Sequence, residues 1–427
     1  MEHSTTQIIV SSAIFITAYI LIIWDKFDRA VIAMSGASLM ILFKILSQEN
    51  AFKEIDFNTL GLLISMMVIV MITKRSGIFE YLAVKTVKIA RGEPIKILML
   101  LSVTTGLLSA FLDNVTSILL IIPVTLSITK DLNINPIPFI ITEIFASNVG
   151  GTATLVGDPP NIMIGSSVGL SFMDFIKNIA PIAIPMLFMI TFIFVLMYRK
   201  KLIATSEAKT KILEMDEKKC IKDRSLLIKS LIILSLTIIG FMLHSVLHYE
   251  SATIAITGAV ALLFFSNISP EKILHEVEWK TIFFFVGLFI MVGGLKEAGV
   301  IKILAKNAID LTQGDLILTT MTILWVSAIA SAFLDNIPFV ATMIPLIKDM
   351  GTMSGMNLTP VWWALSLGAC LGGNGTIIGA SANVIATGLA EEQGHKITFR
   401  NYFKVAFPIM ILSIVASSIY LFIFYLM

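Results

Sequence analysis

A five-residue stretch that occurs twice constrains this chain more than any other feature. Ala-Phe-Leu-Asp-Asn at 110–114 recurs at 332–336, so position 335 repeats position 113, a displacement of 222. The same displacement aligns residues far to either side, among them Gly36 with Gly258, Pro123 with Pro345, Gly157 with Gly379 and Asn161 with Asn383. One register maintained over so long a span indicates two copies of a single structural unit.

The composition places both copies in a lipid bilayer. Of 427 residues, 56% are hydrophobic and 14% are charged, whereas soluble domains carry roughly 25% charged residues. Residues 1–7 lack a basic segment, so we expect the first apolar run to be a retained span and not a cleaved signal peptide. The net charge of +2 gives no indication of nucleic-acid binding, and Cys220 and Cys370 form no disulfide or metal motif.

Each half contains four apolar runs long enough for a membrane span of about 20 residues. They lie near 8–24, 29–46, 57–73 and 178–198, and near 226–246, 251–267, 279–295 and 402–426. Between the third and fourth runs of the first half lie an amphipathic stretch (76–91), two apolar runs around Asp113-Asn114 (95–129) and a segment (137–169) rich in glycine and proline at 148–161. Because glycine and proline interrupt helices, we expect a re-entrant hairpin at 95–129 and a discontinuous spanning helix at 137–169.

This pattern predicts an all-α polytopic membrane protein with two inverted five-crossing repeats, at 1–198 and 226–427, joined by a charged linker at 199–225. An odd number of crossings inverts the second copy. The basic residues around 74–96, against a mixed set around 296–315, and the linker that begins Arg199-Lys200-Lys201 place the linker in the cytoplasm and both termini outside. If each hairpin arm is instead a full span, two crossings are added per half and the inversion is unchanged.

Inverted repeats with discontinuous helices are typical of secondary transporters, which bind their substrates near the bilayer midplane where the helices break. Polar residues cluster at the two predicted hairpin tips and the two breaks. The candidate ligands of a coupling ion or substrate are Asp113, Asn114, Asn148, Gly151, Thr152, Thr154, Gly157, Asp158, Asn161, Asp335, Asn336, Gly373, Asn374, Thr376, Gly379, Ser381 and Asn383. The copies differ where Asp158 is matched by Ala380 and Glu143 by Leu365.

Four acidic residues, Asp113, Asp335, Glu143 and Asp158, are candidate proton carriers, and Na⁺ is expected at Asp113-Asn114 and Asp335-Asn336. Intramembrane acids are functional in most cases. The alternative is that each Asp-Asn pair caps the following helix, that the glycines permit close helix packing and that Glu143 makes a buried structural bond. His244 and His248, four residues apart, form either an interfacial pair or part of a metal site.

Lysine and arginine are absent from 97–129, 131–176, 307–347 and 349–395. We therefore expect a site without a cationic side chain, which suits Na⁺ or H⁺ better than a bare anion. Helix N-termini or a bound cation could still hold an anion. No nucleophile or metal motif of a membrane enzyme is present, so we expect no enzymatic activity and no cofactor beyond Na⁺ or H⁺ as coupling ions.

The motifs at 111–116 and 148–161, the latter ending Gly157-Asp158-Pro159-Pro160-Asn161, resemble the ion transporter superfamily along almost the whole chain. The sequence is most similar to the branch that holds the P protein, the ArsB permeases and the NhaD sodium/proton antiporters. Divalent-anion/sodium symporters of this superfamily carry Ser-Asn-Thr at the hairpin tips, where this chain has Asp113-Asn114-Val115 and Asp335-Asn336-Ile337.

The resemblance implies a homodimer that works by an elevator movement. Its transport-domain cores would lie at about 95–170 and 317–390, and its scaffold helices at about 8–46 and 226–267. Together with the acidic tips, it leads us to expect a secondary active transporter of the inner membrane that exchanges Na⁺ or another cation for H⁺. The alternative is Na⁺- or H⁺-coupled transport of a carboxylate, an oxyanion or arsenite.

Overall fold

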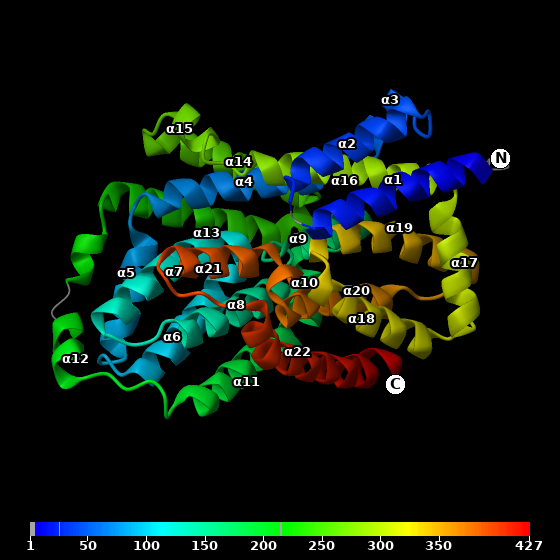
Figure 1. Ribbon diagram of the computed structural model, residues 1–427. Helices are drawn as coiled ribbons and strands as arrows, with labels where there is room; N and C mark the ends of the chain where they lie inside the picture. Colours follow the sequence, from blue (N-terminus) through cyan, green and yellow to red (C-terminus); the bar gives the residue numbers. More distant parts are fainter. Residues whose placement is uncertain (1–4, 25, 214–215) are drawn as a thin grey trace.

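The computed structural model describes residues 5–24, 26–213 and 216–427, in which the regular elements are helices (Figure 1). Residues 214–215 of the predicted linker lie outside this set. The first half comprises α1 (Thr5–Trp24), α2 (Arg29–Leu42), α3 (Gln48–Lys53), α4 (Phe57–Lys74), α5 (Ile78–Ile89), α6 (Pro94–Ser109), α7 (Asn114–Asp131), α8 (Ile137–Thr152), α9 (Pro159–Val168), α10 (Phe172–Asn178) and α11 (Ala180–Tyr198).

The linker and the second half continue the all-helical architecture. The linker contains α12 (Ser206–Leu213) and the short helix η1 (Glu217–Cys220). The second half comprises α13 (Arg224–Leu247), α14 (Ser251–Ser266), α15 (Pro270–Leu274), α16 (Trp279–Glu297), α17 (Val300–Thr312), α18 (Leu316–Phe333), α19 (Asn336–Ser354), α20 (Thr359–Gly372), η2 (Gly373–Gly375), η3 (Ile377–Gly379), α21 (Ser381–Glu392), α22 (Phe399–Leu421) and η4 (Phe422–Leu426).

The two halves are copies in structure as well as in sequence. The pairs α2 with α16 and α4 with α14 pack against each other, as do α6 with α8 and α18 with α20. The amphipathic helices α5 and α17, which are repeat partners, lie at opposite ends of the molecule (Figure 1), as expected for inverted copies. The predicted fold class of inverted repeats with hairpins and discontinuous helices is confirmed.

Several helices suit a membrane environment. Among the described residues, eight helices are long and apolar enough to cross a bilayer. The spans predicted near 29–46 and 251–267 are shorter than expected, because α2 has 14 residues and α14 has 16. Left-handed backbone ends both regions, at Lys44 with φ 55° and at Asn267 with φ 57°.

Local sequence signals position the hairpins and the breaks. The side chain of Asp113 caps α7 and that of Asp335 caps α19, so each Asp-Asn pair turns the chain at a hairpin tip. In the first discontinuous helix, α8 ends at Thr152 and α9 begins at Pro159, where proline is favoured because the first helical N–H needs no partner. In the second, η2 and η3 separate α20 from α21.

The linker contacts the amphipathic helix α5 of the first half and the residues next to it. Lys88 of α5 pairs with Glu217, and Lys209 Nζ lies 2.9 Å from Glu93 Oε1. The ammonium group of Lys209 holds the pKa of Glu93 below its usual range. The backbone N–H of Lys222 donates to the carbonyl of Ser76 at 2.9 Å. The linker and α5 therefore lie on the same side of the molecule.

Candidate functional site

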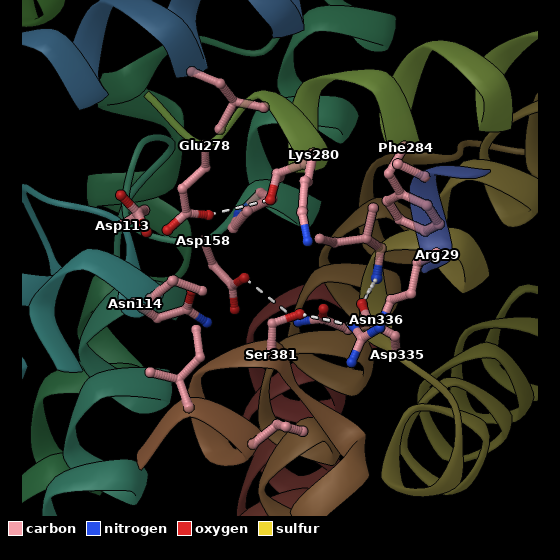
Figure 2. Close-up of a pocket in the computed structure, with 18 of the residues that line it drawn as sticks. Arg29, Asp113, Asn114, Asp158, Glu278, Lys280, Phe284, Asp335, Asn336 and Ser381 are labelled. Carbon is pink, nitrogen blue, oxygen red and sulfur yellow. Dashed lines mark hydrogen bonds and ion pairs between the residues drawn. The ribbon is translucent and has the colours of Figure 1, made fainter. Parts of the chain in front are cut away.

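A cavity of about 320 Å³ lies where the two hairpin tips and the two helix breaks meet the starts of α2 and α16 (Figure 2). We call it the tip cavity. The polar and charged side chains that line it are Asp28, Arg29, Asp113, Asn114, Asp158, Glu278, Lys280, Thr281, Asp335, Asn336 and Ser381. Six of the predicted ligands thus share one cavity although they come from four separate stretches of sequence.

At the first tip, Asp113 is bound by the helix that it starts. Its Oδ1 accepts a hydrogen bond from the backbone N–H of Thr116 at 2.8 Å, and its Oδ2 accepts one from the Thr116 hydroxyl. The residue is 7% exposed. Asp113 therefore caps α7, as one interpretation of the sequence proposed, and also lines the tip cavity.

At the second tip, Asp335 has partners from outside its own helix. Its Oδ1 accepts from the backbone N–H of Ile337 at 3.1 Å. Its Oδ2 accepts from Arg29 Nη1 at 2.7 Å and from the Ser381 hydroxyl at 2.8 Å. The two tips therefore differ, although their sequences are nearly identical.

Arg29 corrects the expectation that the site contains no cationic side chain. A second cation, Lys280, also lines the cavity and lies 3.0 Å from Asp28 Oδ2. The hydrogen bond from Lys280 lowers the pKa of Asp28. Arg29 and Lys280 lie outside the stretches of sequence that lack lysine and arginine. They lie in the first turns of α2 and α16 and reach the cavity through tertiary packing.

Asp158 lies between the two tips (Figure 2) and is fully buried. Asn336 Nδ2 donates to its Oδ1 over a long 3.4 Å. Among the described residues, its Oδ2 has no hydrogen-bond partner. Burying an ionised carboxylate without partners is unfavourable, so this oxygen is suited to bind a proton or a cation.

Buried amide side chains support the cavity from behind and join the two halves. Asn114 Nδ2 donates to Asn148 Oδ1 at 3.1 Å, and Asn148 Nδ2 donates to the Oδ1 atoms of Asn374 and Asn383, each at 2.9 Å. Asn161 Nδ2 donates to the carbonyls of Thr152 and Thr154. The amide network thus satisfies the unwound backbone of the breaks, as irregular backbone at membrane depth requires.

The remaining predicted ligands lie in the wall and not at the cavity surface. The Thr154 and Thr376 hydroxyls donate to the carbonyls of Ala110 and Ala332, and Asn383 Nδ2 donates to those of Gly373 and Thr376. The wall also contains Gly151, Thr152, Gly157, Asn374 and Gly379. These residues shape the breaks and hold the tips against them.

Two other candidates lie away from the tip cavity. Glu143 is buried between helices, where its Oε1 accepts from the Thr125 hydroxyl at 2.7 Å. His244 and His248 line a separate cavity near the start of α14. The described residues contain no group of three metal-binding side chains. The structure therefore offers no support for a histidine metal site.

Replacing Asn148 with leucine is expected to lower the free energy of unfolding by about 2 kcal/mol. The change removes the central member of the amide network and leaves buried amide groups unpaired, each at roughly 1–3 kcal/mol. Thermal melting of the detergent-solubilised protein measures the loss. Asn401→Leu, at an exposed position on α22, is the control, and equal melting temperatures of the two variants would contradict the supporting role.

Comparison with known proteins identifies the family to which this arrangement belongs. The model of the citrate transporter family matches residues 19–368. The chain belongs to that family. It is 40% identical to an uncharacterized transporter of Mycobacterium tuberculosis over 98% of both chains, and 40% identical to a 46 kDa membrane protein of Mycobacterium leprae over 98% of this chain and 99% of that one.

More distant similarities agree with the predicted superfamily branch. The human P protein is 33% identical over 97% of this chain, which spans 60% of that protein. The crystal structure of the YdaH transporter from Alcanivorax borkumensis superposes with a TM-score of 0.60 at 13% identity and covers 86% of this chain and 85% of that one. The protein is therefore a multi-pass membrane transporter of the ion transporter superfamily.

Proposed function

We propose that this transporter exchanges Na⁺ or another small cation for H⁺. The observation that carries the proposal is the convergence of three buried carboxylates, Asp113, Asp158 and Asp335, on the tip cavity. Among the described lining residues, five acids face two cations, Arg29 and Lys280. The net negative charge attracts a cation, and a carboxylate without full hydrogen bonding can exchange that cation for a proton.

The three carboxylates would have different roles. Asp158 and Asp335 would bind the cation or the proton, with Asn336 and Ser381 as further oxygen ligands. Asp113, whose two oxygens are bound by Thr116, would fix the first tip and add negative charge. The Na⁺ sites expected at Asp113-Asn114 and Asp335-Asn336 would thus be unequal.

The movement that completes transport follows from the resemblance. The hairpins and discontinuous helices would move as a transport domain against scaffold helices α1, α2, α13 and α14 in an elevator mechanism, within a homodimer in the inner membrane. The linker would be cytoplasmic and both termini outside. Contacts between the linker and basic helix α5 support their placement on one side of the bilayer.

Na⁺- or H⁺-coupled transport of a small anion is the second candidate. It is favoured by Arg29 and Lys280 in the cavity wall and by the description of the matched family as citrate transporters. The starts of helices α2 and α16 at the cavity also provide positive potential. In that case, the carboxylates would bind the coupling ion beside the anion.

Proteoliposomes that contain the purified protein and a trapped pH dye distinguish the two candidates. We expect Na⁺ or Li⁺ to evoke a proton flux that Asp335→Asn abolishes and Asp113→Asn only reduces, because asparagine can still cap α7. Asp310→Asn, at an exposed position on α17, is the control. A flux evoked by citrate, sulfate or arsenite, without a response to cations alone, would assign the protein to anion transport instead.

A further inference from the structure

The inverted repeat allows the starts of α2 and α16 to be compared residue by residue with the starts of their repeat partners. At the tip cavity, α2 starts after Asp28 and α16 after Glu278. Their repeat partners, α14 and α4, start after Glu250 and Asp56. A second cavity of about 290 Å³ lies at these partner starts, lined by Asn58, Glu250 and Ser251 among others. Each pair of helix starts therefore borders a cavity.

The acids at these two pairs of helix starts are repeated, but the cations are not. Glu250 repeats Asp28, and Asp56 repeats Glu278. Arg29, in contrast, is matched by Ser251, and Lys280 by Asn58. The helix starts thus contribute two acids and two cations to the tip cavity, but Glu250 with the neutral residues Asn58 and Ser251 to the second cavity. Asp56 lines a different cavity, together with Lys296 and Lys348.

Arg29 is placed to act on the second tip directly. It is the first residue of α2, and its Nη1 lies 2.7 Å from Asp335 Oδ2 and 3.1 Å from the Ser381 hydroxyl. The arginine side chain is 28% exposed and the aspartate side chain 6%. One guanidinium group thus joins α2 to the second hairpin tip and to the start of α21, the second segment of a discontinuous helix.

A buried carboxylate bound to a guanidinium group is not available to a free cation. Charge-assisted hydrogen bonds of this kind are about twice as strong as neutral ones, and the low local dielectric strengthens the attraction. Any ion that binds Asp335 Oδ2 must therefore first displace Arg29. The same carboxylate would be free of this competition if the second tip moved away from the start of α2.

We propose that Arg29 is a tethered cation that holds the second tip at the start of α2. The transported cation must displace Arg29 before it can bind Asp335. The proposal rests on the proposed cation exchange. Because Ser251 replaces Arg29 at the other end of the scaffold, the competition operates in one conformation alone. The site therefore binds its cation weakly in the conformation seen here, and Arg29 promotes release on this side of the membrane.

Cation-evoked proton flux in proteoliposomes tests the competition. In Arg29→Gln, we expect the half-saturating Na⁺ or Li⁺ concentration to fall about tenfold, while Arg29→Lys, which keeps the charge, stays close to the wild type. Lys302→Gln, at an exposed position on α17 outside the tip cavity, is the control, and we expect less than a twofold change. An unchanged value in Arg29→Gln, or equal changes in Arg29→Gln and Lys302→Gln, would overturn the proposal while cation exchange stands.

Disulfide cross-linking provides a readout that does not depend on transport. Ser166 Oγ of α9 lies 3.0 Å from Asp56 Oδ1 at the start of α4, so cysteines at these two positions report the conformation seen here. In a background with Cys220→Ser and Cys370→Ser, we expect Arg29→Gln to lower the cross-linking yield at least twofold. If the wild type exchanges no cation, the proposed function fails, and the cross-linking yield by itself tests whether Arg29 holds the second tip. A lower yield in Arg29→Gln supports that role, and equal yields with and without Arg29 overturn it.

Discussion

Replacing Asp158 with asparagine is expected to abolish cation-evoked proton flux, with a loss of at least about 100-fold. The substitution keeps the size of the side chain and its hydrogen bond with Asn336 but removes the charge and the proton-binding oxygen. Among the three carboxylates of the tip cavity, Asp158 is the one whose Oδ2 has no partner among the described residues. An ion or proton bound there replaces interactions that the protein itself does not supply.

The position of Asp158 makes this effect large. It lies between the two tips and follows the break between α8 and α9 (Figure 2). Its repeat partner is Ala380, so the second half contains no equivalent carboxylate that could take over. Flux is measured in proteoliposomes with the trapped pH dye, and an unchanged gel-filtration profile and melting temperature establish folding. Flux at the wild-type rate would exclude Asp158 as the exchanging group.

Replacing Gly157 with alanine is expected to destabilise the protein by about 3 kcal/mol and to reduce the yield of folded protein strongly. A Cβ atom at this position would lie 2.5 Å from the Ser109 carbonyl oxygen, 2.6 Å from that of Gly151 and 2.7 Å from Gly151 Cα. All three are backbone atoms that hold the first hairpin against the first break. Overpacking costs roughly 1–3 kcal/mol. We expect a cost at the upper end of that range because the three nearest atoms belong to the backbone and cannot rotate away as a side chain can.

The repeat provides a second test of this prediction, and a glycine in open space provides the control. A Cβ atom at Gly379, the partner of Gly157, would lie 2.6 Å from the Gly373 carbonyl oxygen and 2.8 Å from that of Ser331. We expect Gly379→Ala to behave like Gly157→Ala. Gly388→Ala in α21, where no atom lies within 4 Å, should retain the wild-type melting temperature. A melting temperature of Gly157→Ala within 2 °C of that control would show that the break tolerates a side chain.

The sequence was sufficient to predict features that depend on neighbouring residues. The hairpin expected at 95–129 is formed by α6 and α7, and the break expected near 148–161 lies between α8 and α9. Apolar runs, capping aspartates, glycine and proline act over a few residues, so their pattern can be read along the chain. The repeat then predicted the same elements in the second half and their inversion.

The tertiary structure decided how the chemically similar residues differ. Asp113 and Asp335 occupy equivalent positions in the sequence, yet Thr116 binds the first and Arg29, 306 residues away, binds the second. The amide of Asn148 similarly finds its partners 226 and 235 residues away. Local patterns determined where the chain turns and breaks, whereas partners brought together by packing determined which carboxylate is capped, which is paired with a cation and which retains an unpaired oxygen.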